Sequence, residues 1–304
     1  MEFRNLLAQW GICLGRECPE LVPAGSPNRT ICRHVVEDTD GILFIAEGFE
    51  LRKKHKQIRQ NELLEFLQSN HLPGVVPFLR CADNAHGVNA GGCFWQLRRW
   101  VAGDALPRES LGDEVRYAGI WGEFLLKLAE KSSALPHNMI LPNERFFFAD
   151  YMGKLRDFSR RKMPEFSAEI NLIEKALQSF FHAENSLPCQ FAHGDFHPGN
   201  ILVSSGQLTA VIDWEFAGMK CAGYDLALLL GCLGRDNPAW LDGKVTRQMQ
   251  QQLYQAGYMP DAAWERLVEL MAAIRLGWLG EWIDLGDKAL AAGELAYIRM
   301  LLNI

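Results

Sequence analysis

The sequence of 304 residues contains no long apolar run and no large excess of one charge. Without a stretch of about eighteen apolar residues, no transmembrane helix is expected. The net charge of −6 argues against a nucleic-acid partner or an anionic membrane surface. The first residues include Glu2, Arg4 and Arg16 and lack the apolar core of a signal peptide. We therefore expect a cytoplasmic protein.

The eight cysteines form no CxxC pair, which argues against a zinc ribbon or a dithiol redox site. Because free cysteine is commonly buried, we expect mostly buried and reduced thiols. The chain also lacks internal repeats and low-complexity tracts. Its 48% apolar and 22% charged residues are typical of a folded protein, long enough for one large domain or two lobes.

The first hundred residues are predicted to form strands with one helix. Residues 30–36 and 42–46 are rich in β-branched and aromatic residues, and the turn-forming sequence EDTDG joins them, which predicts a hairpin. Residues 50–70 have apolar positions at helical spacing. Residues 74–80 and 93–101 are predicted to be two further strands.

From about residue 113 onward, apolar residues recur every three or four positions, as at Tyr117, Trp121 and Phe124. This spacing predicts helices. Two short strands around the turn SSGQ, at 204–207, interrupt them. The sequence therefore predicts an α+β protein, with a sheet lobe over residues 1–100 and a larger, mainly helical lobe over residues 101–304.

Two stretches, FAHGDFHPGNILV (191–203) and LTAVIDWEFAG (208–218), place polar side chains beside apolar runs. Phosphoryl transfer to an alcohol requires a carboxylate that orients the hydroxyl and accepts its proton, beside oxygen ligands for Mg²⁺. Asp195 and Asn200 lie on one loop, and Asp213 ends the next strand pair. The alternative is that these groups only cap turns, but the joint occurrence of both motifs weakens it.

The sequence HGDFHPGNIL followed by VIDWEFAG resembles the signature of the aminoglycoside phosphotransferase and choline kinase family. The resemblance implies a bilobal protein-kinase-like fold, with a small N-terminal antiparallel sheet lobe and a larger helical C-terminal lobe. It implies that Asp195 is the catalytic base, that Asn200 and Asp213 bind Mg²⁺, and that His193 braces the loop. His197 either makes a simple hydrogen bond or helps to neutralise the transferred phosphoryl group.

Outside these two motifs the resemblance is less specific. Asp225, in GYDLALLL, matches an aspartate that supports the catalytic loop from a helix start. The sequence AGSPNRT (24–30) is similar to a nucleotide loop, although ordinary turns share its composition. The backbone near residues 98–100 would contact adenine, and position 62 is either the helix glutamate of the family or a solvated acid. The candidate nucleotide-binding residues are Gly25, Ser26, Asn28, Glu62, Arg98 and Trp100.

One departure from the family concerns its second long strand, which usually carries a lysine or arginine that pairs with the helix glutamate and grips the phosphates. Here Ala46 and Glu47 stand in that region. Three explanations stay open: a nearby cation substitutes, the strand is aligned incorrectly, or the nucleotide binds in an unusual way. The candidate substitutes are Arg33, Arg52, Lys53 and Lys54.

The motifs predict a phosphotransferase that uses ATP, or alternatively GTP, with Mg²⁺ to phosphorylate a hydroxyl group of a small molecule. Homoserine, choline-like amines, sugars and aminoglycosides are acceptors within the family. The alternative is a nucleotide-binding scaffold with little turnover, favoured by the missing lysine but opposed by the intact Asp195, Asn200 and Asp213. The expected partners are a nucleotide and a hydroxylated substrate, and the oligomeric state is unknown.

The acceptor is predicted to carry an amine because of a late helix, IRLGWLGEWIDLGD. Trp278 and Trp282 are four positions apart on one face, with Glu281 on a neighbouring edge. Aromatic rings and carboxylates suit an amine. Glu281 and Trp282 are therefore candidate substrate contacts, with burial of both tryptophans in the core as the alternative.

Overall fold

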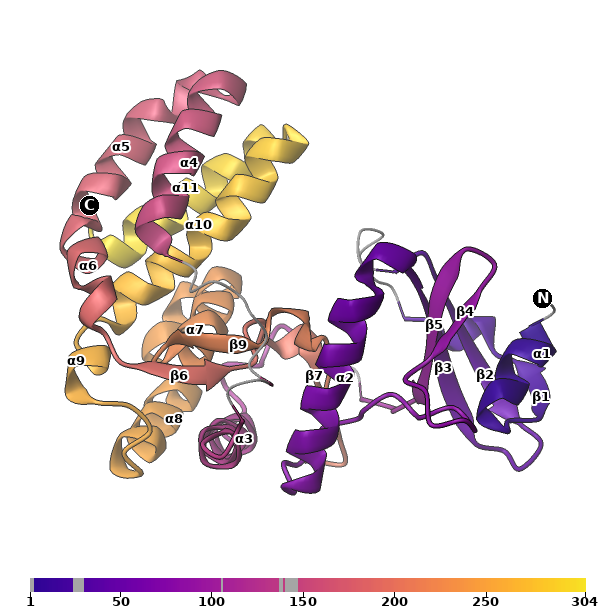
Figure 1. Cartoon of the computed structure of the whole chain (residues 1–304). Helices are drawn as coiled ribbons and strands as arrows, with labels where there is room; N and C mark the ends of the chain where they lie inside the picture. The colour runs from indigo at the N-terminus through magenta and orange to yellow at the C-terminus, as the bar shows by residue number, and fades with distance from the viewer. Residues whose placement is uncertain (1–2, 24–29, 105, 137–138, 140–146) are drawn as a thin grey trace. The chain divides into compact units, whose positions relative to one another are not determined.

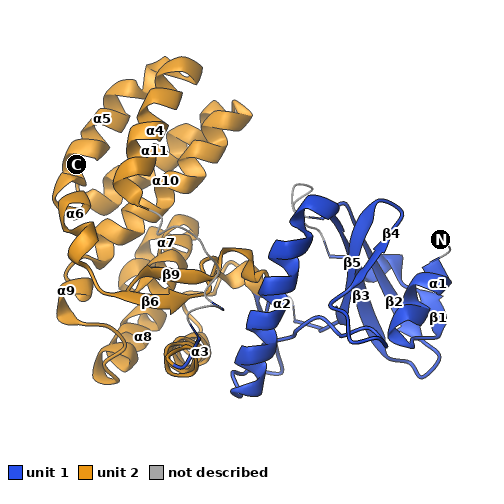
Figure 2. Ribbon diagram, in the orientation of Figure 1, with its two compact units in different colours: residues 1–104, 134–141, 201–212 blue, residues 105–133, 142–200, 213–304 orange. Residues whose placement is uncertain are grey.

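The structure is a computed structural model that describes residues 3–23, 30–104, 106–136, 139 and 147–304. By internal packing the chain divides into two compact units (Figure 2). Unit 1 comprises residues 1–104, 134–141 and 201–212, and unit 2 comprises residues 105–133, 142–200 and 213–304. The predicted division into functional lobes at residue 100 remains a prediction.

Unit 1 contains a five-stranded antiparallel sheet in the order β1-β2-β3-β5-β4 (Figure 1). The predicted 37–41 turn between β2 and β3 is confirmed, as is the strand within 93–101. The helices and strands of the unit are α1 (Phe3–Leu7), β1 (Leu14–Glu17), β2 (Cys32–Asp38), β3 (Leu43–Glu50), α2 (Lys54–Ser69), β4 (Val88–Ala90), β5 (Cys93–Arg99), β7 (Ile201–Ser204) and β8 (Gln207–Val211).

The two faces of this sheet differ in chemistry. Val36, Phe44, Ala46 and Leu97 form an apolar core with Leu7 of α1 on one face. Because side chains alternate across a strand, the neighbours of these residues point to the opposite face.

The opposite face is partly polar. Glu47 of β3 pairs in register with Gln96 of β5, and both side chains are buried. Helix α2 contributes buried polar residues at helical spacing, namely Gln57, Gln60 and Asn61. Figure 1 shows α2 alongside the sheet of unit 1. Buried polar groups require partners, so this face must be organised by hydrogen bonds and ion pairs.

The prediction of a strand over residues 74–80 is wrong, because this segment forms no β-ladder with a neighbouring strand. Pro77 has no backbone N–H to donate to a ladder. The N–H of Phe78 donates to Asn61 Oδ1 at 2.7 Å, and the carbonyl of Phe78 accepts from Asn61 Nδ2 at 3.1 Å. A side chain of α2 thus occupies both backbone polar groups of Phe78, which are then not available for a ladder.

The predicted hairpin around SSGQ is confirmed as β7 and β8, with Ser205 and Gly206 at positive φ in the two-residue turn. Other segments of unit 1 hold it in place. Gly74 C=O accepts from the backbone N–H of Val211 at 2.8 Å. The Asp104 N–H donates to the carbonyl of Val203 at 2.7 Å, and the Asp104 carboxylate accepts from the Ser205 N–H at 2.9 Å.

Unit 2 is mainly helical, as predicted, and also contains the antiparallel pair β6 and β9. The α+β class is thereby confirmed. The elements are α3 (Arg116–Ser132), α4 (Phe148–Lys162), α5 (Ser167–Ala176), α6 (Gln178–Ala183), β6 (Cys189–Ala192), β9 (Gly218–Cys221), α7 (Tyr224–Asp236), α8 (Lys244–Gln255), α9 (Asp261–Trp264), α10 (Leu267–Leu285) and α11 (Lys288–Leu302).

Helix α10 packs against α7 and α11. At this packing contact Arg275 makes a bidentate ion pair with Glu294, at 2.5 and 2.7 Å. Both side chains are almost fully buried. A buried charge is tolerated only when it is paired and hydrogen-bonded, so this pair fixes how α10 and α11 align.

The expectation that the cysteines are mostly buried is wrong. All eight are free, but only Cys18, Cys81 and Cys221 are buried. Of the others, Cys32, Cys93 and Cys232 are half-buried, and Cys13 and Cys189 are exposed. None of the helices in the described part of the chain combines the length and the hydropathy that a membrane span requires.

Candidate active site

The loop between β6 and β7 carries the sequence HGDFHPGN, and one glycine determines its course. Gly194 has φ of +85°, a conformation that other residues rarely adopt. A Cβ atom at this position would lie 2.2 Å from the carbonyl oxygen of Phe216. The loop therefore turns closely against the IDWEF segment of the second motif, and only glycine permits this approach.

Asp225 holds the start of this loop from the first turn of α7. Its carboxylate accepts the N–H of His193 at 2.7 Å and the N–H of Gly194 at 2.9 Å. Burial raises the pKa of Asp225 to about 6, against the lowering effect of these two N–H groups and of Lys220. These contacts agree with the predicted role of Asp225, which is to hold the catalytic loop from the start of a helix.

Aromatic packing secures the middle of the loop. The buried ring of His193 lies 4.5 Å from Trp214, edge to face, and its Nδ1 accepts from the Asp195 N–H at 3.2 Å. Phe196 is fully buried and stacks on Phe124 of α3 at 5.2 Å. Asp195 therefore stands between two anchored rings, in agreement with a bracing role for His193.

The side chain of Asp195 is 13% exposed and held in a fixed orientation. Asn200 Nδ2 donates to Asp195 Oδ2 at 3.0 Å and to its carbonyl at 2.9 Å. His197 Nε2 lies 3.7 Å from Asp195 Oδ1, while His197 Nδ1 accepts from the Gly199 N–H at 3.1 Å. The structure thus brings together the predicted base, one predicted metal ligand and both histidines.

Asp213 follows β8 and has φ of +69°, which is uncommon for a residue other than glycine. Such strained backbone persists where surrounding structure enforces it, and it often marks functional positions. Within the described residues, no three His, Cys, Asp or Glu side chains cluster closely enough to hold a metal ion. An amide and a carboxylate oxygen, from Asn200 and Asp213, fit Mg²⁺, because Mg²⁺ keeps waters and substrate phosphates as its other ligands.

The predicted nucleotide-binding residues fall into two groups. Gly25, Ser26 and Asn28 lie outside the described residues. Arg98 and Trp100 lie at the end of β5, where the Trp100 N–H donates to the carbonyl of Leu43 at 3.0 Å. Their nucleotide contacts remain predictions.

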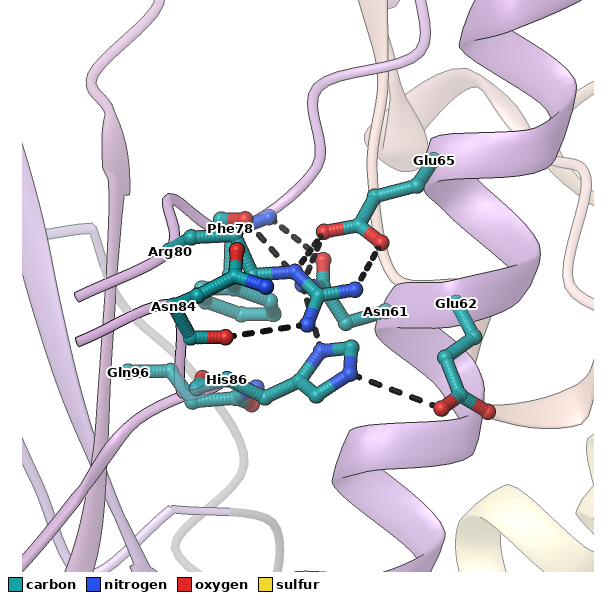
Figure 3. Close-up of polar contacts among 8 residues, drawn as sticks. All are labelled: Asn61, Glu62, Glu65, Phe78, Arg80, Asn84, His86 and Gln96. Carbon is teal, nitrogen blue, oxygen red and sulfur yellow. Dashed lines mark hydrogen bonds and ion pairs between the residues drawn. The ribbon is translucent and has the colours of Figure 1, made fainter. Parts of the chain in front are cut away.

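Glu62 belongs to a hydrogen-bonded network between α2 and the segment before β4 (Figure 3). Its carboxylate lies 3.4 Å from His86 Nε2. His86 Nδ1 lies 3.3 Å from Asn61 Nδ2. Burial and the nearby Arg80 charge lower the pKa of His86, against the opposite effects of Glu65 and Glu62. Glu62 is therefore paired with a histidine that sequence reasoning did not identify.

The same network contains a bidentate ion pair between Arg80 and Glu65 of α2. Arg80 donates from Nε to one carboxylate oxygen and from a terminal nitrogen to the other, each at 2.6 Å. Arg80 also donates to the carbonyl of Asn84 at 3.2 Å. Figure 3 shows that these contacts and those of His86 lie on the same side of α2. The network fixes α2 to the loop that precedes β4.

On β3, Ala46 and Glu47 point to opposite faces. Ala46 lies in the apolar core, whereas Glu47 lies on the polar face. Glu47 Oε1 accepts from Arg33 Nε at 2.9 Å, and Glu47 Oε2 lies 3.0 Å from a terminal nitrogen of Arg98. Of the candidate substitutes for the missing lysine, Arg33 is thus on this face, while Arg52 is exposed and pairs with Glu50.

The candidate substrate contacts lie on α10. Trp278 and Trp282 are half-buried and Glu281 is exposed, so neither tryptophan is a fully buried core residue. The Arg275 guanidinium lies 4.2 Å from the centre of the Trp278 ring. The protein's own cation therefore lies over Trp278, and substrate contact by Glu281 or Trp282 remains a prediction.

A family model described as "Phosphotransferase enzyme family" matches residues 22–270. Because the match covers most of the chain, the protein belongs to this family. The family and the enzyme class predicted from the two motifs are confirmed.

Solved structures with the same fold confirm the bilobal protein-kinase-like architecture. The amicoumacin kinase hAmiN, in complex with AMP-PNP, Ca²⁺ and Ami, has a TM-score of 0.71 at 14% identity and covers 100% of this chain and 94% of its own. An aminoglycoside phosphotransferase in complex with GDP and kanamycin has a TM-score of 0.67 at 15% identity, with 97% and 96% coverage.

A curated relative is the homoserine kinase of Gluconobacter oxydans (strain 621H). It is 28% identical over 144 residues, which cover 45% of this chain. The match spans 46% of the length of that relative.

Proposed function

We propose that the protein transfers the γ-phosphoryl group of ATP, with Mg²⁺, to a hydroxyl group of a small amine-bearing molecule. The observation that carries this proposal is the fixed carboxylate of Asp195 within a family of phosphotransferases. Asn200 Nδ2 orients it by a hydrogen bond to Oδ2 at 3.0 Å and also donates to the backbone carbonyl of Asp195 at 2.9 Å. A carboxylate held in this way can orient the acceptor hydroxyl and receive its proton.

The residues around Asp195 have separate tasks. Asp225 fixes the backbone N–H groups of His193 and Gly194, so that the loop keeps its turn. His197 faces Asp195 Oδ1 at 3.7 Å and contributes a ring N–H near the reacting groups. Preorganised groups of this kind lower the barrier because they need not reorient during the reaction.

Asn200 and Asp213 would hold Mg²⁺. When bound, the metal neutralises charge on the phosphate oxygens. Asp213 supplies the only anionic oxygen of this pair. Asp213→Ala should therefore abolish Mg²⁺-supported ATP turnover, whereas Asp242→Ala, at an exposed aspartate, should leave it unchanged. Titration of Mg²⁺ at fixed ATP measures this, and parent-like titration by Asp213→Ala would exclude the assignment.

Adenine is assigned to the main chain at the end of β5. The Trp100 N–H donates to Leu43 and so points toward β3. Because N–H and C=O groups alternate sides along a strand, those of Arg99 point away from β3. Arg99 therefore offers main-chain groups to a base. Structural neighbours were solved with AMP-PNP and with GDP, so GTP is the alternative donor.

The acceptor class follows from the relatives and from α10. The curated relative is a homoserine kinase, and a structural neighbour is an aminoglycoside phosphotransferase with kanamycin. Both names denote molecules that combine an amine with a hydroxyl group. Exposed Glu281 beside half-buried Trp282 suits such an amine through ion pairing and cation–π contact.

A phosphate-transfer assay tests the proposal with homoserine, choline, amino sugars and aminoglycosides as acceptors and with Mg-ATP or Mg-GTP as donors. Nucleotide consumption should rise with at least one acceptor and should yield the phosphorylated product by mass spectrometry. Nucleotide binding without acceptor-dependent consumption across the panel would instead identify a scaffold with little turnover.

A further inference from the structure

A buried charge cluster on the polar face of the unit 1 sheet contains Arg33, a candidate substitute for the missing lysine, and Arg98, a candidate nucleotide-binding residue. The Glu47 side chain is 4% exposed and lies between two guanidinium groups, those of Arg33 and Arg98. Each arginine side chain is 17% exposed. Burial of a charged side chain is favourable only when it is paired and hydrogen-bonded, as Glu47 is here.

Three strands build the cluster. Arg33 of β2 stands directly opposite Glu47 of β3, and Glu47 stands opposite Gln96 of β5. Arg98 is two positions beyond Gln96 and so projects from the same face. The cluster is therefore fixed by the sheet itself and does not depend on a flexible loop.

The charges of the cluster do not balance. Two guanidinium groups face one carboxylate, which leaves one positive charge in a largely dehydrated site. The neighbouring carboxylate of α2, Glu62, lies against His86 (Figure 3), and among the described residues the ion pairs of Arg33 and Arg98 are made with Glu47. The Lys54 ammonium lies 5.5 Å from the ring centre of Phe94 on β5, which adds positive charge near the same face.

Arg98 also has unused donor capacity. Its guanidinium lies 5.2 Å from the ring centre of Phe78, and its Nε is buried without a hydrogen-bond partner among the described residues. A buried donor without an acceptor is unfavourable, because it has lost its hydrogen bonds to water. A multivalent anion such as a phosphate chain offers the acceptor oxygens that a planar guanidinium matches best.

We infer that Arg33 and Arg98, clamped by Glu47, form the subsite that binds the nucleotide phosphates. The carboxylate orients both arginines, and the surplus charge attracts the anion. The inference rests on the proposed function, since that function supplies the nucleotide. In this inference, Arg33 of β2 and Arg98 of β5 replace the lysine or arginine that β3 lacks.

The test is direct binding of ATP, adenosine and tripolyphosphate, by calorimetry, to the parent and to Arg33→Ala, Arg98→Ala and the double variant. Each single change should weaken ATP and tripolyphosphate binding by about tenfold or more, because each removes a charge-assisted contact. Adenosine binding should stay within twofold. Arg16→Ala is the matched control, since Arg16 also belongs to this sheet, on β1, but its side chain is 57% exposed and pairs with Glu37.

Thermal unfolding accompanies each titration. If an alanine variant does not fold, Arg33→Lys and Arg98→Lys replace it, and ATP should bind more weakly because the fork geometry is lost. If the variants at Arg33 and Arg98 only lower the melting temperature and leave ATP affinity unchanged, the cluster is a structural ion pair and the inference is overturned. Parallel loss of adenosine and ATP binding would overturn it as well.

The outcomes separate this inference from the proposed function. If ATP or tripolyphosphate binding depends on the two arginines but no acceptor is phosphorylated, the subsite is supported and the proposed phosphotransferase function is excluded. Normal phosphate transfer with unaffected ATP binding in all arginine variants retains the function and removes the subsite. Failure of the parent to bind either ATP or tripolyphosphate also removes it.

Discussion

At the scale of single residues, Asp195 is the position on which the proposed chemistry depends. Asp195→Asn preserves the shape of the side chain but removes the acceptor of the hydroxyl proton. We expect kcat to fall by roughly 10² or more, as is usual for the loss of a general base, while ATP binding and the melting temperature stay near those of the parent. Steady-state kinetics with the best acceptor measures the change. Parent-like turnover would remove Asp195 from this role.

His86 is the residue whose titration the structure constrains most clearly. Asn61 Oδ1 accepts from the Phe78 N–H, so Asn61 must present its Nδ2 group to His86 Nδ1. The ring nitrogen Nδ1 is therefore an acceptor, and Nε2–H faces Glu62. A proton on Nδ1 would place two donors face to face, which agrees with the lowered pKa of His86.

This lowered pKa gives a sign for the pH dependence of stability. The folded state favours the neutral ring, so His86 contributes stability above its unfolded pKa of about 6.5. That contribution is lost as the pH falls below this value through the lower folded pKa. We expect the difference in melting temperature between the parent and His86→Gln to shrink from about pH 7 to about pH 5. A constant difference over this range would contradict the assignment.

At the scale of structural elements, the catalytic loop depends on Gly194. Gly194→Ala adds both a disfavoured φ and a Cβ atom 2.2 Å from the carbonyl of Phe216. Gly206→Ala is the matched control, because Gly206 has φ of +74° but no atom within 4 Å of an added Cβ. The control should lose about 1 kcal/mol of stability and keep its activity. Gly194→Ala should lose more stability, and its kcat should fall at least tenfold as the loop shifts.

Chemical denaturation and phosphate-transfer kinetics together measure this difference. Equal stability losses in the two variants, with equal activity, would show that the close approach to Phe216 does not position the loop.

The elements also show how far local sequence predicts the fold. The β2–β3 hairpin and the loop with HGDFHPGN follow from turn composition and motif spacing, which are local properties. The strand predicted at 74–80 fails because Asn61, on a different element, binds the backbone of Phe78. The alternation of side chains along β3 does predict that Glu47 and Ala46 point to opposite faces of the sheet. The pairing of Glu47 with Arg98 could not be predicted, because it requires β5 to lie next to β3.

At the scale of the whole molecule, the chain passes repeatedly between the two units. The candidate metal ligands Asn200 and Asp213 belong to unit 2, yet the hairpin that joins them, residues 201–212, packs within unit 1. Sequence order alone would assign this hairpin to the C-terminal half. The reason lies in contacts that are distant in sequence, such as those of Asp104 with Val203 and Ser205.

This arrangement predicts that Asp104 affects the metal ligands through the hairpin. Asp104→Ala removes the acceptor of the Ser205 N–H and of the Ser204 hydroxyl, at 2.9 and 3.1 Å. Amide exchange in the hairpin should accelerate by about tenfold, in line with the loss of one or two hydrogen bonds, while α10 and α11 remain unchanged. The Mg²⁺ concentration for half-maximal turnover should rise, because both ligands flank the loosened segment. Asp83→Ala, which removes a single turn bond to the Ala85 N–H, is the control and should change neither quantity. Faster exchange spread evenly over both units would instead indicate global destabilisation and leave the hairpin without a specific role.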